Sequence, residues 1–557
     1  MNKLLIVSMA LAATQTVLAV DPSGTLPVLH IDTENHQTIV SKEDYLAGTY
    51  YLDPRGAEGI DAIGSAAEPA VLQIRGRGNY TWTGFDKKPY RLKLDKKAAL
   101  MGTKKSKHYA LLAHADDREG FMHNILGLEL SRRFGLAWTP ADKPVEVVLN
   151  GEYIGLYFLT ETIRVDEDRV NIVEQPDNIT DPEAITGGWL LEIDNYDTDP
   201  HVRIHENGDN DIIFTYKTPE VLSAQQEAWL RDEMTDINAK IYASDKDNCT
   251  WADKVDLDAL ARYFLVQEIM DDHESFHGSC YMHRELGAGS KWFFGPVWDF
   301  GSSNITTTKT QTIAEDRMWH QTWIGEMVKF PAFIDKVKEV WADLYTSGVI
   351  NDVMDYVTAT ADLIDRAAKT DKERWPEYGN DDVKEKSEVI NRNLRNRMLW
   401  LNNRYGQSSP DKIITVYFED NNPTPWDNVK AFSWCSAGTP FGEWPGSDCK
   451  RIDNFNQYPT WSYSYDMSLL PDDVGEMGLI FNNGHSGKGN QTDDFVLTPG
   501  GIYRMEGYYG SGVEDVATDG SEGPVEYYSL QGLRIANPGS GLYIRRQGNA
   551  VTKVLLQ

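Results

Sequence analysis

The chain has 557 residues, 41% hydrophobic and 25% charged, which is typical of globular proteins and too long for one compact core. Its formal net charge of -31 disfavours nucleic acid and anionic lipid as partners, because both are negatively charged. At about 100 to 200 residues per domain, the length predicts two to four domains.

The first residues predict export. MNKLLIVSMALAATQTVLA has a lysine near its start, an apolar run and small or apolar residues before Val20, which is the pattern of a secretory signal peptide. We expect residues 1–19 to be removed and the protein to be secreted or held at the cell surface. A membrane anchor is the alternative. It is disfavoured because the run is short for a span and no later stretch reaches about 18 apolar residues, so no transmembrane segment is expected.

The chain has four cysteines, and an even number in an exported chain permits two disulfides. Cys435 and Cys449 are near enough in sequence to close one loop, whereas Cys249 with Cys280 is a weaker pairing. No CxxC or histidine-rich spacing indicates a zinc site.

Residues 21–405 are predicted to form one large mixed domain that begins with strands. AVLQIRGRGN and KKPYRLKLD predict two strands, and EGFMHNILGLELSRRFG predicts a helix that stops at Gly135. PVEVVLNGEYIGLYFLTE then has two β-rich runs around Asn150 and Gly151, which is a strong hairpin signal.

Longer helical stretches follow GGWLLEIDNYD, including LSAQQEAWLRDEMTDINAKIYA, LDALARYFLVQEIM and the region 325–404. The pattern predicts an α+β fold in which a β-rich first lobe precedes a helical second lobe. The cleft between two such lobes is a usual place for a ligand.

A domain boundary is predicted at residues 406–412, where Gly, Ser and Pro cluster. Short strands rich in Trp and Tyr follow, so residues 411–506 are predicted to be a small β-sandwich. A second polar linker leads to a strand-rich tail at residues 522–557.

Two basic segments of the first lobe can bind anions. IRGRGNYTW places Arg75 and Arg77 beside glycines, which permit close backbone approach, and guanidinium groups match phosphate or carboxylate oxygens. In KKPYRLKL, alternation puts Arg91 and Lys93 on one strand face and Lys88 on the other. A solvated strand face is the alternative for this second segment.

Acidic residues gather in two later segments. Asp272 and Glu274 lie in EIMDDHESFHG, and Asp299 follows the apolar run of WFFGPVWDFGSS, so we expect Asp299 to be partly buried beside a divalent cation or an arginine. Clustered carboxylates suit magnesium-dependent phosphoryl transfer or glycoside hydrolysis. For a single acid, a helix cap or a surface ion pair is the alternative.

The triplet Asp299 to Gly301 matches the metal-binding triplet of ordinary protein kinases, but the chain has no HRD loop, VAIK strand or GxGxxGxV loop. Instead, RGRGNYTW, KKPYRLKLD, HYALLAHADDREGFMHN, VEVVLNGEYIGLYFLTETIRVDEDRVNI, GGWLLEID and FGPVWDFG together resemble the spore coat protein H (CotH) kinase family over residues 27–404. The resemblance implies an atypical protein kinase that uses ATP and Mg²⁺ or Mn²⁺ to phosphorylate serine of an exported protein.

The resemblance also implies roles for single residues. Lys88 or Lys93 would neutralise ATP phosphates, and Arg75 and Arg77 would shape the nucleotide lobe. Glu161 would lie where the hairpin enters the cleft. Asp299 would bind the metal.

One departure from the family concerns the catalytic acids. The family usually has Asn, one further residue, Asp and Ser, where this chain has Asp272, His273, Glu274 and Ser275. Glutamate is one methylene longer than aspartate, and a misplacement of about 1 Å can cost about 100-fold in rate. A non-catalytic surface glycan-binding protein that keeps the kinase-like fold is therefore one alternative, and a glycan hydrolase is another.

The predicted β-sandwich resembles the family 26 starch-binding modules through ITVYFEDNNPTPWDNVKAFSW, EWPG and GLIFNNGHSGKGNQTDDF. The resemblance implies binding of a starch-like α-glucan, with Tyr417, Trp426 and Trp434 stacking on sugar rings and Asn490 and Gln491 as polar partners. The alternative is that two of these aromatic residues fill the core. The tail is similar to C-terminal sorting domains of type IX secretion substrates, although a plain hairpin has the same pattern.

Overall fold

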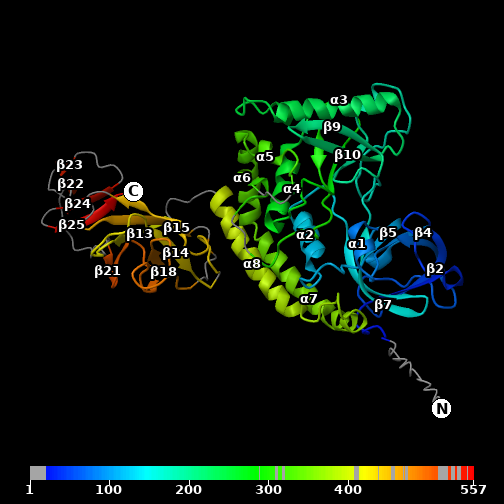
Figure 1. Cartoon of the computed structure of the whole chain (residues 1–557), viewed down its shortest axis with the longest axis horizontal. Helices are drawn as coiled ribbons and strands as arrows, with labels where there is room; N and C mark the ends of the chain where they lie inside the picture. The colour runs from blue at the N-terminus through cyan, green and yellow to red at the C-terminus, as the bar shows by residue number, and fades with distance from the viewer. Residues whose placement is uncertain are drawn as a thin grey trace, which may run out of the picture.

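The computed structural model describes residues 20–287, 289–307, 311–315, 320–406, 413–436, 438–452, 458–467, 470, 475–511, 525–528, 534–535, 541–547 and 550–556. The predicted signal peptide and almost all of the predicted boundary at residues 406–412 lie outside these ranges. Figure 1 shows the strands of the first part, the helices of the middle part and the C-terminal sheets in chain order.

The first part is a closed barrel with the strand order β1-β2-β3-β4-β5-β7-β6. Its strands are β1 (Val28–Thr33), β2 (Leu46–Asp53), β3 (Ala70–Gly76), β4 (Tyr90–Ala98), β5 (Ser106–Leu112), β6 (Asp142–Leu149) and β7 (Glu152–Glu161). Alternate residues point inward, so Leu72, Ile74 and Leu92 fill the interior while the residues between them face out. The predicted hairpin is confirmed: Asn150 and Gly151, with φ of 53° and 82°, join β6 to β7.

A second sheet has the order β12-β11-β8-β10-β9. Its strands are β8 (Trp189–Asp194), β9 (His201–Asn207), β10 (Asn210–Thr218), β11 (Cys280–Arg284) and β12 (Trp292–Phe294). The sequence predicted no strands at β9 and β10. In β9 the alternation rests on Val202 and Ile204 alone, because the third inward residue is the charged Glu206.

The helices confirm most of the predicted helical stretches. They are α1 (Tyr80–Gly84), α2 (Met122–Arg133), α3 (Ala224–Ile241), α4 (Leu257–Met270), α5 (Ile324–Met327), α6 (Pro331–Thr346), α7 (Val349–Arg374) and α8 (Val383–Tyr405). Helix α2 ends shortly before Gly135, whose φ of 75° suits glycine at a helix terminus. The helices and the second sheet share one large apolar core.

Helix α7 also holds the barrel. Asp371 near its end forms an ion pair of 2.8 Å with Lys87, and both side chains are 0% exposed. The same carboxylate accepts a hydrogen bond of 2.8 Å from the backbone N–H of Leu156 in β7. At Gly155 an added Cβ would lie 2.3 Å from Asp371 Oδ1, so glycine is required where the helix meets the strand.

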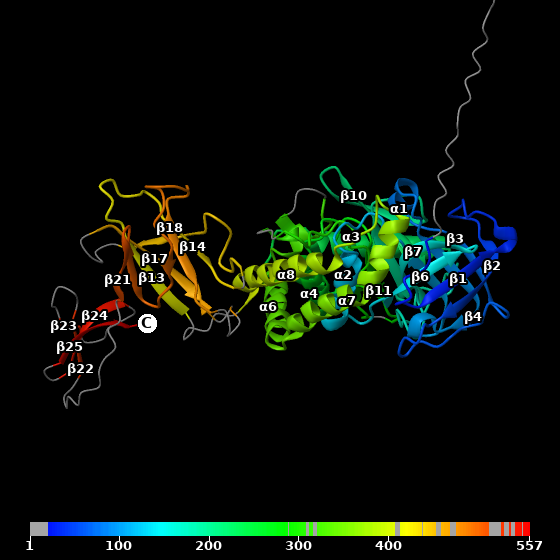
Figure 2. The same cartoon turned by 90° about the horizontal axis from the view of Figure 1, so that it is seen from below.

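Two further sheets share one apolar core, and we call them the sheet pair. One contains β13 (Ile413–Glu419), β16 (Lys450–Ile452), β17 (Thr460–Asp466), β20 (Gly501–Arg504) and β21 (Gly507–Ser511), and the other β14 (Lys430–Trp434), β15 (Ser447–Asp448), β18 (Gly478–Asn482) and β19 (Phe495–Val496). Helix α8 contributes Leu399 to this core, and the Asn403 side chain donates to the carbonyl of Pro440. Both views show α8 leading to the sheet pair at one end of the molecule (Figures 1 and 2).

The last strands, β22 (Val525–Tyr528), β23 (Arg534–Ile535), β24 (Gly541–Gln547) and β25 (Ala550–Leu556), form a separate sheet. The four cysteines are all described, and none is in a disulfide, so the permitted pairings are not found. Within the described residues, no helix has the length and apolarity that crossing a membrane requires. The fold is mixed α and β, consistent with the α+β prediction, while the kinase-like two-lobed arrangement and the domain limits stay predictions.

Candidate functional site

A cavity of about 450 Å³ is lined by both the barrel and the second sheet, and we call it the cation cavity. Its lining residues are Arg77, Arg91, Ala110, the segment 162–165, Glu174, Asp199, Pro200, Tyr216, Lys217, Thr218, Glu220, Tyr281 and Trp298. Arg164 in that segment adds a third guanidinium group to those of Arg77 and Arg91. With Lys217, four cationic side chains line the cavity together with the three carboxylates of Glu174, Asp199 and Glu220, and Lys217 pairs with Asp199 at 3.4 Å.

Two of these guanidinium groups have no carboxylate partner in the part of the chain that the structure describes. Among the described residues, no ion pair joins Arg91 or Arg164 to an acid, and Arg91 Nε is buried without a hydrogen-bond acceptor. Burial, together with the charges of Arg75 and Arg164, lowers the pKa of Arg91. Keeping such cations together is costly without an anion, so these arginines suit an anionic ligand.

Arg77 connects this cavity to Asp299. Its guanidinium lies over the Trp298 ring, 5.8 Å from the centroid. Burial lowers the pKa of Arg77, and the nearby charge of Asp299 opposes that shift. Asp299 itself is exposed, contrary to the expectation that it is partly buried, because β12 ends at Phe294 and Asp299 lies in the loop that follows.

A second carboxylate faces Asp299 from the segment between β5 and α2. An added Cβ at Gly301 would lie 3.4 Å from Asp299 Oδ1 and 3.7 Å from Asp116 Oδ2, so the two acids flank Gly301. Although the Asp116 side chain is exposed, desolvation by the surrounding protein, together with the charges of Asp299 and Asp117, raises its pKa to about 6. Among the residues described, no three His, Cys, Asp or Glu side chains converge closely enough to hold a metal without other ligands.

Asp272 and Glu274 follow the end of α4. Asp272 is buried, and its Oδ1 accepts a hydrogen bond of 2.7 Å from Ser302 Oγ. Glu274 is half-buried and accepts a bond of 3.1 Å from the Asn195 amide. Burial, with the charge of Asp299 adding to it, raises the pKa of both acids to about 7. Both groups can therefore exchange a proton near neutral pH.

Four other predicted site residues lie outside the cation cavity. Arg75 donates to the carbonyl of Lys42, and Lys88 Nζ donates to the Trp82 carbonyl at 2.8 Å. Lys93 is exposed on β4. Glu161 is buried, accepts from the Ala141 N–H, and has its pKa raised by burial.

The sequence missed three residues of the site. Strand alternation correctly put Arg91 and Lys93 on one face of β4, but the resemblance assigned the phosphate contacts to Lys88 or Lys93 and not to Arg91. Arg164 and Asp116 lie outside helices and strands, where no periodicity indicates the direction of a side chain.

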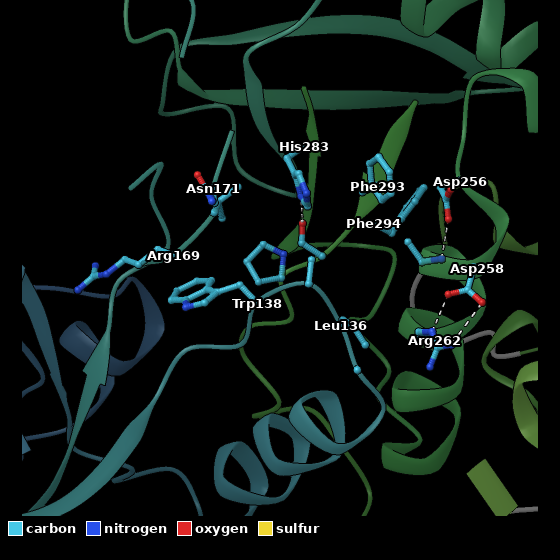
Figure 3. Close-up of a pocket in the computed structure, with 16 residues that line it drawn as sticks. Leu136, Trp138, Arg169, Asn171, Asp256, Asp258, Arg262, His283, Phe293 and Phe294 are labelled. Atoms are coloured by element: carbon cyan, nitrogen blue, oxygen red, sulfur yellow. Dashed lines mark hydrogen bonds and ion pairs between the residues drawn. The ribbon is translucent and has the colours of Figure 1, made fainter. Parts of the chain in front are cut away.

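A second cavity, of about 250 Å³, lies beside β11, β12 and the start of α4 (Figure 3). Its charged groups are satisfied within the protein. Asp258 pairs with Arg262 at 2.6 Å, and Asp256 accepts from the Ala259 N–H at 2.9 Å. Arg169, which also lines this cavity, donates to the carbonyls of Thr162 and His108. The arginines here therefore have acceptors within the protein, unlike Arg91 Nε.

The sheet pair separates the predicted sugar-binding residues. Tyr417 and Trp426 are buried, and Trp426 stacks on Phe418 in the core with 5.4 Å between ring centroids. Asn490 and Gln491 make hydrogen bonds within their own loop. These four side chains therefore have structural contacts in the sheet pair.

Trp434 belongs to a cluster of aromatic rings that points away from that core. It stacks on Phe432 with 5.7 Å between centroids, and Trp444 meets Phe432 edge-on at 5.3 Å. Trp444 is 38% exposed. An added Cβ at Gly478 would lie 2.1 Å from the Trp434 indole, so glycine lets this ring lie flat on β18. We call Phe432, Trp434 and Trp444 the aromatic face.

Two comparisons bear on this site. A family model described as CotH kinase protein matches residues 74–401, which is more than half of the chain and includes the whole cation cavity with Asp272, Glu274 and Asp299. A search of curated proteins finds no match.

Proposed function

Because the chain belongs to the CotH kinase protein family, we propose that it is an atypical kinase that transfers the γ-phosphate of ATP to serine of an exported protein. The observation that carries the proposal is the convergence of Arg77, Arg91 and Arg164 in one cavity beside Asp299. Guanidinium groups are well suited to phosphate oxygens. The acids next to them supply the groups for metal binding and proton transfer.

The residues present fit ATP and a divalent cation. A cavity of about 450 Å³ is within the range of small-molecule sites, and its unpaired arginines complement a triphosphate. Mg²⁺ in proteins is usually held by one or two carboxylates together with phosphate oxygens and water, and Asp299 and Asp116 are two such carboxylates. When bound, the cation would neutralise charge on the phosphate oxygens.

The two acids after α4 have separable roles in this proposal. Glu274, which is half-buried, accepts the proton of the acceptor serine hydroxyl. Asp272, buried and bonded to Ser302, holds the segment in place because its Oδ1 also accepts from the Glu274 N–H at 3.3 Å.

The nucleotide part of the proposal is tested by Arg91→Gln. We expect this change to weaken binding of Mg²⁺ and a non-hydrolysable ATP analogue about 10-fold to 100-fold in isothermal titration calorimetry, since one charge-assisted hydrogen bond contributes about 1.5–3 kcal/mol. Lys93→Gln is the matched control, because Lys93 is on the same strand face but outside the cavity. Equal losses in both variants, or in neither, would show that the cation cavity is not the nucleotide site.

The reaction itself is tested by incubating the protein with labelled ATP, Mg²⁺ or Mn²⁺, and a serine-rich acceptor. Incorporated label that depends on the metal is the expected result. ATP binding without incorporation favours a non-catalytic binding protein. Release of reducing sugar from soluble starch would favour a glycan hydrolase instead.

We propose in addition that the aromatic face binds an α-glucan and so holds the enzyme near starch-like polymer. Exposed indole and phenyl rings stack on the apolar faces of sugar rings. Trp434→Ala is expected to weaken retardation in native gels containing soluble starch by about tenfold or more. Tyr508→Ala is the control, because Tyr508 is an exposed aromatic residue elsewhere on the sheet pair. Unchanged retardation of Trp434→Ala would contradict the proposal.

A further inference from the structure

The acid that the proposed function assigns to the metal lies in a strained loop. We call residues 299–304 the Asp299 loop. Asp299 has a φ of 60°, in the left-handed region that non-glycine residues rarely adopt. Such a conformation costs about 1–3 kcal/mol and persists only where the surroundings hold it. The contacts that hold this loop therefore decide where the Asp299 carboxylate lies.

Helix α2 supplies the contacts on one side of the loop. Asn124 Oδ1 accepts a hydrogen bond of 3.1 Å from the backbone N–H of Phe300, the residue directly after Asp299. The Phe300 ring is fully buried over Gly127, where an added Cβ would lie 2.3 Å from the ring. His123 Nε2 lies 3.2 Å from the Ser303 carbonyl. One face of α2 thus contacts both the middle and the end of the loop.

A neighbouring histidine sets the orientation of the Asn124 side chain. Asn124 Nδ2 lies 3.4 Å from His114 Nδ1. The amide nitrogen of asparagine can only donate, so His114 Nδ1 is the acceptor in this contact. With the amide nitrogen directed at His114, the amide oxygen faces the Phe300 N–H.

Residues 270–272, at the end of α4 and directly after it, supply the contacts on the other side of the loop. Ser302 Oγ donates to Asp272 Oδ1 at 2.7 Å, and the Asn304 amide donates to Asp271 Oδ2 at 3.2 Å. The Asn304 N–H also bonds to the Met270 carbonyl at 3.1 Å. The loop therefore connects α2 with the acids after α4, and a shift at its α2 side would move Asp299 relative to Asp272.

We propose that Asn124 is a positioning residue that holds the Asp299 loop in its strained conformation and so sets the place of the metal-binding carboxylate. The inference deepens the proposed function and rests on it. Asn124 does not reach the cation cavity, whose lining does not include it. It acts through the Phe300 N–H, one peptide from Asp299.

The test compares two substitutions of similar size. Asn124→Leu removes both hydrogen bonds, whereas Asn124→Asp keeps an acceptor for the Phe300 N–H. We expect Asn124→Leu to lower kcat about 100-fold, as a displacement of about 1 Å does, with less than a threefold change in the KM for ATP. Mn²⁺ binding, measured by electron paramagnetic resonance with an ATP analogue present, should weaken about tenfold. Asn124→Asp should recover most of both losses.

A control separates positioning from a general loss of stability. Asn391→Leu removes a half-buried amide that bonds α8 to the Met354 carbonyl and Thr358 in α7. This change should lower the melting temperature without changing Mn²⁺ affinity. If Asn124→Leu does not fold, Asn124→Ser and Gly127→Ala, which displaces the Phe300 ring, test the same contacts.

The possible outcomes distinguish this inference from the proposed function. Equal Mn²⁺ affinity and kcat in Asn124→Leu and the unmodified protein would overturn the positioning role, and so would equal losses in the Leu and Asp variants. If the unmodified protein binds neither Mn²⁺ nor nucleotide, the proposed function fails. Hydrogen exchange of the Phe300 amide then tests the hydrogen bond between Asn124 and Phe300 alone: faster exchange in Asn124→Leu supports this contact, and unchanged exchange contradicts it.

Discussion

Asp299→Asn is expected to lower metal-dependent phosphate transfer by about 1000-fold or more. The substitution keeps the size of the side chain but removes the charge that would hold the cation beside Arg77. Binding of ATP without metal should be unchanged or slightly tighter, because the arginines of the cation cavity remain and one negative charge near the phosphates is gone. Label transfer and calorimetry on the same preparation measure both effects.

The pH dependence gives a second measurement of the same residue. The charge of Asp299 is one cause of the raised pKa of Glu274, which is about 7. A base acts in its deprotonated form, so the rate of the unmodified protein should rise as pH increases through about 7 and level off above it. In Asp299→Asn the pKa of Glu274 should fall. The increase of the residual rate with pH should therefore occur at a lower pH than in the unmodified protein. Asp95→Asn is the control, because Asp95 is an exposed carboxylate on β4, and its substitution should leave the pH profile unchanged. If Asp299→Asn transfers phosphate at the unmodified rate, Asp299 does not bind the metal.

The part of the fold that the sequence predicted is the part set by short-range signals. Asn150 and Gly151 adopt positive φ angles that suit a tight hairpin, and Gly135 follows the end of α2 for a similar reason. Strands β9 and β10 were missed because part of their inward-facing positions is polar, as at Glu206, which accepts from Tyr242 and from the Trp323 N–H. Those partners are distant in sequence, so no local pattern indicated them.

The candidate site was predicted less completely because long-range packing assembles it. Strand alternation sufficed to put Arg91 and Lys93 on one strand face, but only the structure shows that Arg164 and Arg77 meet Arg91 in one cavity. Similarly, Trp426 and Trp434 both lie in aromatic-rich segments, and only the position of each relative to the two sheets shows which ring is in the core. A single sequence supplies the residue types of such a site, whereas the tertiary fold decides which of them face each other.

Lys87→Met is expected to lower the free energy of unfolding by about 3–5 kcal/mol, because it leaves the buried carboxylate of Asp371 without its counter-charge. From the sequence alone, Lys87 has the pattern of a solvated strand cation. In the structure it is 0% exposed, and its ammonium lies near the Phe121 and Tyr157 rings, 5.2 and 5.3 Å from their centroids. Urea denaturation followed by tryptophan fluorescence measures the change.

A second substitution shows whether the uncompensated charge of Asp371 causes the loss of stability. Asp371→Asn removes the charge but retains an oxygen that can accept from the Leu156 N–H, which a leucine at this position would leave unsatisfied. The double variant Lys87→Met with Asp371→Asn should therefore recover most of the lost stability. Lys369→Met, which breaks an ion pair between more exposed side chains on the same helix, should have little effect. If the double variant is no more stable than Lys87→Met, the loss comes from packing around the lysine stem, and α7 holds the barrel by shape rather than by this ion pair.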